Sequence, residues 1–163
     1  MKTATRLVLL IFSISLISSC AKEDDAPAGT TPTLATFLKG NFNVTQTDYS
    51  GSLSSLLGSI PVSGTGTNTD GFFLFESFTK TTTYLLNTNM EVATVSYPLY
   101  VGGAGTFEIL SETSFNINDA LSGTTTYEVS ERTTNSLIIS TGYDGDTLGG
   151  SANLVLNIYL TKD

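Results

Sequence analysis

Reactive side chains are scarce in this chain of 163 residues. It contains one cysteine, Cys20, and no histidine. An internal disulfide, a cysteine and histidine zinc site and an imidazole general base are therefore ruled out. Serine and threonine are abundant, but no Gly-x-Ser-x-Gly motif surrounds a serine that could act as a nucleophile. We predict that the protein is not an enzyme and uses no cofactor.

Carboxylates are the remaining candidates for chemistry. Asp144 and Asp146 lie in the segment Tyr143-Asp144-Gly145-Asp146, and oxygen-rich loops that contain glycine can bind calcium. Two carboxylates are too few for such a site, so the segment is better explained as a hairpin turn and no metal is expected. The other acidic residues of the central region are predicted to lie on the wet faces of strands: Glu76, Glu108, Glu112, Glu128 and Glu131.

Cys20 follows a segment with the features of a secretory signal. Two cations precede an apolar run from Leu7 to Ile17, which is about half the ~20 residues that a membrane-spanning helix needs. Residues 17–20, Ile-Ser-Ser-Cys, resemble the lipobox of bacterial lipoproteins. The resemblance implies cleavage after residue 19, acylation of Cys20 and anchoring in a bacterial outer membrane.

Residues 21–33 have the composition of a flexible tether. They include two prolines and no large apolar residue, and such a segment spans about 20 Å on average. The cluster Lys22, Glu23, Asp24 and Asp25 resembles the export signal of surface lipoproteins in the Bacteroidetes, which implies exposure at the cell surface. An ordinary solvated linker is the alternative. The expected organisation is a signal peptide over residues 1–19, a lipidated cysteine and tether over 20–34, and one domain over 35–163.

Charge limits the possible partners. The chain has seven basic and fifteen acidic residues, a net charge of −8. Two of the basic residues lie in the signal, so the mature chain would be more acidic still. An acidic surface repels phosphate backbones, and nucleic acid is therefore not an expected partner. Oligomeric state is not indicated by the sequence.

From Leu38 onward, apolar residues recur at every second position, which is typical of half-buried strands. Strands are predicted over residues 40–49, 72–75 and 81–95. Pro98 and Gly102-Gly103 should interrupt the pattern, which then resumes and continues to a last strand over residues 152–160. Each later strand is marked by an alternating apolar pair: Phe107 and Ile109, Phe115 and Ile117, Tyr127 and Val129, and Leu137 and Ile139.

Two segments depart from this period. Leu53, Leu56, Leu57 and Ile60 have the spacing of one helix face, which predicts a short helix over residues 52–60 that ends at Pro61. A strand through Ile60 and Val62 is the alternative. Residues 64–70 are rich in glycine, threonine and asparagine and predict a loop.

Eight or nine sequential strands without a long crossover favour antiparallel pairing, in a sandwich or a closed barrel. The strand beginning Gly40-Asn41-Phe42, the segments 105–109, 113–119 and 126–129, and the C-terminal strand resemble the lipocalin-like lipoprotein domains common in Bacteroidetes. The resemblance implies an all-β, antiparallel up-and-down barrel of about eight strands, possessing at most one short helix.

The resemblance also implies an interior able to hold one small apolar or amphiphilic ligand. In the alternative, the interior is a packed core and the protein is a non-catalytic structural or interaction lipoprotein that contacts a protein or glycan at the cell surface. A solvent-accessible cavity would favour ligand binding, and an apolar external patch would favour the alternative. The expected interior residues are Phe42, Val44, Phe73, Phe75, Tyr84, Leu86, Phe107, Ile109, Tyr127 and Leu156.

Overall fold

A computed structural model describes residues 32–55, 58–147 and 150–163. These described residues belong to one compact unit. The predicted signal peptide, Cys20 and the export cluster Lys22, Glu23, Asp24 and Asp25 lie outside the described residues. The elements are α1 (Leu34–Phe37), β1 (Gly40–Ser55), β2 (Gly58–Thr65), β3 (Thr67–Glu76), β4 (Thr81–Val92), β5 (Val95–Ser111), β6 (Ser114–Asp119), β7 (Gly123–Arg132), β8 (Ser136–Thr147) and β9 (Gly150–Lys162).

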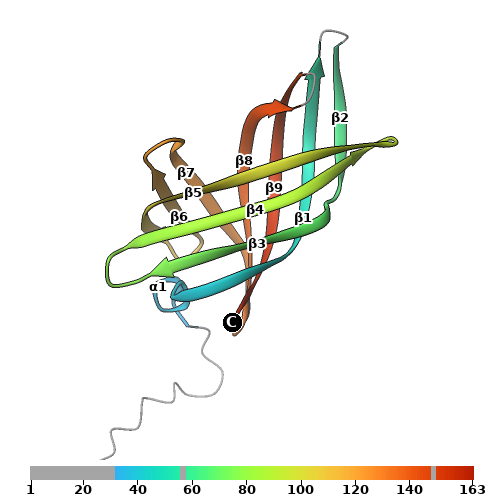
Figure 1. Ribbon diagram of the computed structural model, residues 1–163. Coiled ribbons are helices and arrows are strands. Elements are labelled where there is room, and N and C mark those ends of the chain that lie inside the picture. Colours follow the sequence, from blue (N-terminus) through green and yellow to red (C-terminus); the bar gives the residue numbers. More distant parts are fainter. Residues whose placement is uncertain (1–31, 56–57, 148–149) are drawn as a thin grey trace, which may run out of the picture. The chain divides into compact units, whose positions relative to one another are not determined.

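The strands form one antiparallel sheet that closes on itself (Figure 1). The order is β2-β1-β3-β4-β5-β6-β7-β8-β9, and β1 also pairs with β9. Since β2 pairs only with β1, the closed ring consists of the other eight strands. The predicted all-β, up-and-down, barrel-like fold is confirmed. Within the described ranges, no helix is long and apolar enough to cross a membrane.

The helix predicted over residues 52–60 is wrong. Residues 52–55 continue β1, residues 58–60 begin β2, and Leu53 pairs with Ile60 across this hairpin. Serine and glycine are poor helix formers, so the ladder determines the local structure and the alternative strand through Ile60 and Val62 is correct. The loop predicted over residues 64–70 is also largely strand, because β2 extends to Thr65 and β3 begins at Thr67. Leu56 and Leu57 lie outside the described residues.

Pro98 and Gly102-Gly103 do not interrupt the sheet, contrary to the prediction. β5 is a continuous strand of 17 residues that passes through all three. Residues 95–104 pair with β4 but not with β6, and an unpaired strand edge tolerates proline because no ladder bond on that side is lost. At Gly103 a Cβ atom would lie 2.0 Å from Asp119 Oδ2. Glycine is therefore needed there to admit the carboxylate.

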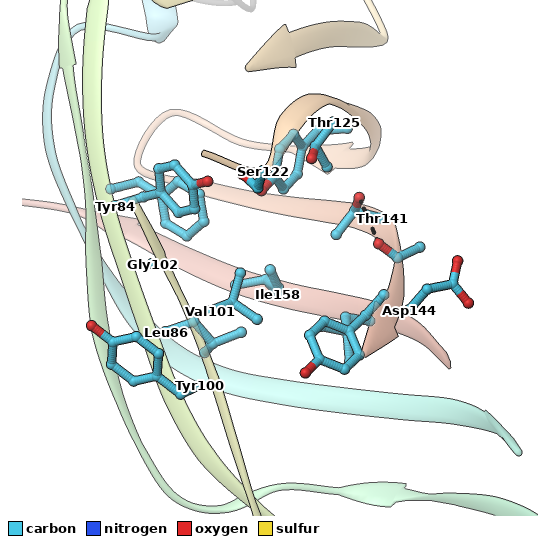
Figure 2. Close-up of a pocket in the computed structure, with 15 residues that line it drawn as sticks. Tyr84, Leu86, Tyr100, Val101, Gly102, Ser122, Thr125, Thr141, Asp144 and Ile158 are labelled. Atoms are coloured by element: carbon cyan, nitrogen blue, oxygen red, sulfur yellow. Dashed lines mark hydrogen bonds between the residues drawn. The ribbon is translucent and has the colours of Figure 1, made fainter. Parts of the chain in front are cut away.

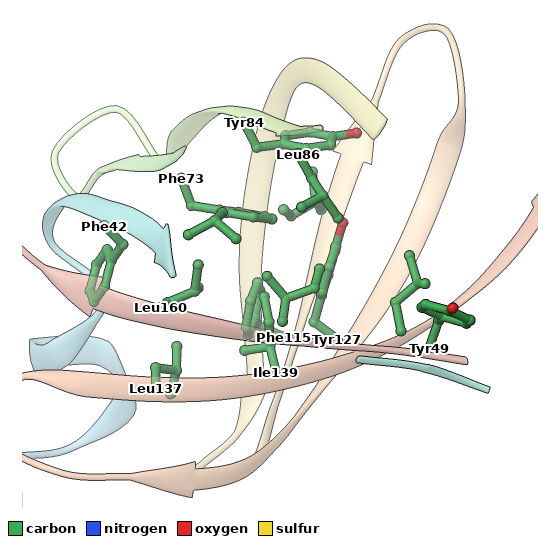
Figure 3. Close-up of a cluster of buried hydrophobic side chains, with 14 of the residues drawn as sticks. Phe42, Tyr49, Phe73, Tyr84, Leu86, Phe115, Tyr127, Leu137, Ile139 and Leu160 are labelled. Atoms are coloured by element: carbon green, nitrogen blue, oxygen red, sulfur yellow. The ribbon is translucent and has the colours of Figure 1, made fainter. Parts of the chain in front are cut away.

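Aromatic side chains cluster inside the barrel, and Figure 3 shows Phe42, Phe73 and Phe115 among them. The ring of Phe75 contacts four others, with centroid distances between 5.2 and 6.2 Å. Leu34 and Phe37 of α1 are buried against this cluster, and the Phe37 ring lies 5.5 Å from that of Phe42. These contacts make the α1 end a solid hydrophobic core. The four rings around Phe75 belong to Phe42, Phe73, Phe107 and Phe115.

Candidate ligand-binding cavity

Two unpaired strand edges leave an opening in the barrel wall. β6 pairs with β5 only from Gly105 onward, and β7 pairs with β8 only as far as Ser140. Residues 95–104 of β5 and 141–147 of β8 therefore each have a single strand neighbour. We call the interval between these two edges the β5/β8 opening.

A cavity of about 430 Å³ lies at the β5/β8 opening (Figure 2). This volume is within the range typical of small-molecule sites. Its apolar lining comes from Phe73, Leu86, Val101, Leu156 and Ile158, and its polar lining from Tyr84, Tyr100, Ser122, Thr125, Tyr127, Thr141, Tyr143 and Asp144. The cavity thus combines a buried apolar surface with several hydroxyl groups.

Tyr84 and Tyr127 are fixed in the cavity wall by ring contacts. Tyr84 stacks on Phe73, with centroids 5.6 Å apart and an interplanar angle of 18°. Tyr127 meets Phe73 edge to face and stacks on Phe115 at 5.2 Å and 8°. Burial raises the pKa of Tyr84, and burial together with Coulombic repulsion from Tyr84 and Asp119 raises the pKa of Tyr127 well above its usual range. Both phenols therefore stay neutral and can donate or accept a hydrogen bond.

Asp119 fixes the turn between β6 and β7 at the edge of the cavity. Its Oδ1 accepts hydrogen bonds from the backbone N–H groups of Leu121 (2.7 Å) and Ser122 (3.1 Å). Its Oδ2 accepts a third from Ala104 N–H at 3.0 Å. These N–H donors stabilise the ionised form, and the pKa of Asp119 is lowered. The carboxylate thereby links the turn to β5 and places Ser122 in the cavity lining.

Thr141 marks the point on β8 where pairing with β7 has ended. Thr141 comes one residue after Ser140, which forms the last β7–β8 ladder pair with Glu128. The Thr141 Oγ1 donates to the carbonyl of Thr126 of β7 at 2.9 Å. This side-chain bond holds β7 against β8 at the boundary of the opening. Loss of the ladder beyond this point leaves the following residues of β8 available to a ligand.

Tyr100 and Asp144 stand on opposite edges of the opening. Both side chains are at exposed positions of their strands, and Tyr100 is 68% exposed. The Asp144 carboxylate accepts a hydrogen bond from Asn153 of β9. Among the described lining residues, Asp144 alone carries a formal charge. The mouth of the cavity is therefore aromatic and acidic.

Half of the predicted interior residues line this cavity: Phe73, Tyr84, Leu86, Tyr127 and Leu156. The others lie elsewhere. Phe42, Val44, Phe75 and Phe107 are buried in the core, and Ile109 is half-buried beside it. Sequence reasoning missed the residues of the opening, because nothing in the alternation shows where a strand lacks a neighbour. Ile158 could have been found, since it shares a strand face with Leu156.

The segment containing Asp144 and Asp146 is part of strand β8 and is not the hairpin turn that the sequence predicted. Each of its residues from Tyr143 to Asp146 has a partner in β9. In residues 32–55, 58–147 and 150–163, no group of three or more acidic side chains is arranged to hold a metal ion.

No protein-family model matches the chain. No match to a curated protein was found either. Fold and cavity together define an all-β, barrel-like protein with a side-opening cavity.

Proposed function

We propose that this chain is a lipid-anchored protein of a bacterial outer membrane, exposed at the cell surface, whose lipocalin-like domain binds one small apolar or amphiphilic molecule. The cavity at the β5/β8 opening is the observation that carries the proposal. Its volume of about 430 Å³ is within the range of sites that hold small molecules.

The lining supports an amphiphilic ligand in particular. Leu86, Leu156 and Ile158 are buried and offer apolar contact, while the neutral phenols of Tyr84 and Tyr127 offer hydrogen bonds. Such a lining, mainly apolar with a few placed polar groups, is typical of sites for small molecules. The location in the envelope rests on the sequence alone, through Cys20 and the acidic cluster that follows it.

A cavity-filling substitution tests the proposal. Val101 lies in the cavity lining on the unpaired stretch of β5, where a larger side chain can enter the cavity. Val101→Phe should weaken binding of 1-octanol, measured by isothermal titration calorimetry, by at least about tenfold, or 1.4 kcal/mol. The matched control is Val155→Phe, because Val155 is exposed on β9. Octanol binding that is absent in the parent, or equal in both variants, would overturn the proposal.

A structural or interaction role is the second candidate. Phe78 and Leu121 are 100% and 98% exposed, in the turns that follow β3 and β6. Large apolar side chains at turn tips are suited to contact with another protein or a glycan. A Phe78→Ser, Leu121→Ser double variant distinguishes this role from ligand binding. In a pull-down the variant should no longer capture the partner, while its octanol binding should be unchanged.

A further inference from the structure

The basic residues of the described chain all lie at the α1 end. Lys39 lies two residues after the end of α1. Lys162 Nζ donates to the Phe37 carbonyl at 3.3 Å, and Lys80 Nζ lies 5.5 Å from the centroid of the Phe107 ring in the aromatic core. Arg132 Nη2 lies 3.1 Å from Glu112 Oε2, an oxygen that also accepts from the first residue of α1.

The strand ends around the cavity carry the opposite charge. Asp144 lines the opening, and Asp146 follows it on β8. Asp119 lies beside Tyr84, and Asp119 Oδ2 and the Tyr84 hydroxyl flank the same Gly103 position. No described basic residue lines this cavity. A cleft with charge of one sign concentrates ligands of the opposite charge.

The lining is also rich in aromatic rings. Tyr84, Tyr127 and Phe73 form its inner wall, and Tyr100 and Tyr143 lie at the opening. Aromatic faces attract organic cations by about 0.5–1 kcal/mol at exposed sites and by about 2 kcal/mol when water is excluded. A carboxylate head group would instead meet Asp144 with no cation to pair with. Aromatic content and charge therefore favour the same ligand class.

We propose that the cavity selects cationic amphiphiles, meaning molecules with an amine or quaternary ammonium head and a short apolar tail. The head lies at the β5/β8 opening among Tyr100, Tyr143 and Asp144. The tail lies against Leu86, Leu156 and Ile158. This inference rests on the proposed function and specifies its ligand class.

Three probes with one tail and different heads test the selection: octyltrimethylammonium, 1-octanol and octanoate. Each is titrated into the chain from residue 21 onward, which retains the whole compact unit and its core. We expect the ammonium probe to bind about tenfold more tightly than octanol, and octanoate to bind more weakly than octanol. Octanol binding as tight as the ammonium probe would overturn the inference while leaving the proposed function intact. Absence of octanol binding would overturn the proposed function itself.

Two variants test whether Asp144 itself, rather than the net negative charge of the surface, attracts the ammonium probe. Asp144→Asn should weaken binding of the ammonium probe about three- to tenfold and leave octanol unchanged. Glu108→Gln removes the same charge from an exposed position of β5 outside the cavity lining and should have no effect. Equal losses in both variants would overturn the inference, because attraction would then come from net charge alone.

The aromatic contribution has its own pair of variants. Tyr100→Phe keeps the ring and should preserve affinity for the ammonium probe, whereas Tyr100→Leu should reduce it about threefold. Tyr100 is mostly exposed, so neither change should affect folding. Equal affinity of the two variants would remove Tyr100 from the site.

Discussion

The Tyr49 hydroxyl makes two hydrogen bonds with the backbone of Glu91. It donates to the Glu91 carbonyl at 2.9 Å and accepts from the Glu91 N–H at 3.0 Å. Tyr49 belongs to β1 and Glu91 to β4, which are not neighbours in the ring because β3 lies between them. Tyr49 is 4% exposed. One buried side chain therefore links two non-adjacent strands.

Tyr49→Phe should lower the free energy of unfolding by about 1–3 kcal/mol. The substitution preserves the ring but removes both bonds to Glu91, and buried polar groups left without a partner cost about this much. Urea denaturation measures the change. Tyr100→Phe is the control, since Tyr100 is exposed and its change should stay within about 0.5 kcal/mol. A Tyr49→Phe protein as stable as the control would show that the hydrogen bonds between Tyr49 and Glu91 do not contribute to stability.

Phe75→Ala should lower the free energy of unfolding by about 3–5 kcal/mol, because its ring contacts four others in the core and its loss leaves a new cavity. Val101→Ala should cost less than about 1 kcal/mol, since Val101 already faces a cavity. Chemical denaturation of both variants provides the comparison. Similar losses at the two positions would contradict the distinction between a solid core and an open cavity.

Asp119→Asn should make stability less dependent on pH. The folded-state pKa of Asp119 is lowered from its ordinary value of 3.8 by the N–H groups of Leu121 and Ser122. Its contribution to stability is therefore complete above pH 3.8 and is lost as the pH falls through the lower folded pKa. Urea midpoints at about pH 6 and about pH 3 test this. The urea midpoint of the parent should be higher than that of the variant at about pH 6, and the difference between the two midpoints should be smaller at about pH 3. A gap independent of pH would mean that ionisation of Asp119 is not responsible.

Cys20→Ala should release the protein from membranes. Acyl chains contribute about 0.8 kcal/mol per buried methylene, and two or more chains are needed for stable anchoring. Detergent-phase partitioning of cell extracts compares the variant with the parent. Identical partitioning would remove the basis for lipidation at Cys20.

Local alternation predicted most of the strands but not β2 or the continuous first half of β5, and pairing between strands decided where the site lies. Phe115, Ile117, Leu154 and Leu156 are buried as their period indicated. A β-bulge between Val44 and Gln46 changes the inward parity of β1, so that Thr47 and Tyr49 are buried after Val44. Alternation alone could not show this shift, nor could it show the lengths of β6 and β7.

The opening depends on a relation between distant segments. It exists because β6 ends at Asp119 and the β7–β8 ladder stops at Ser140, which leaves residues 95–104 of β5 and 141–147 of β8 with one strand neighbour each. Pro98 is compatible with that edge, yet in the sequence it resembled a strand break. Residues such as Tyr100 and Asp144 could therefore be assigned to the cavity only from the closed sheet.

Methyl NMR during titration with 1-octanol tests the central claim most directly, because it reports binding and its location together. Saturable shifts should appear at the methyl groups of Leu86, Val101, Leu156 and Ile158, which line the cavity. The methyl groups of Leu34 and Leu160, which are buried in the core and do not line the cavity, should not move. Absence of saturable shifts, or equal shifts in both sets, would contradict ligand binding at the β5/β8 opening.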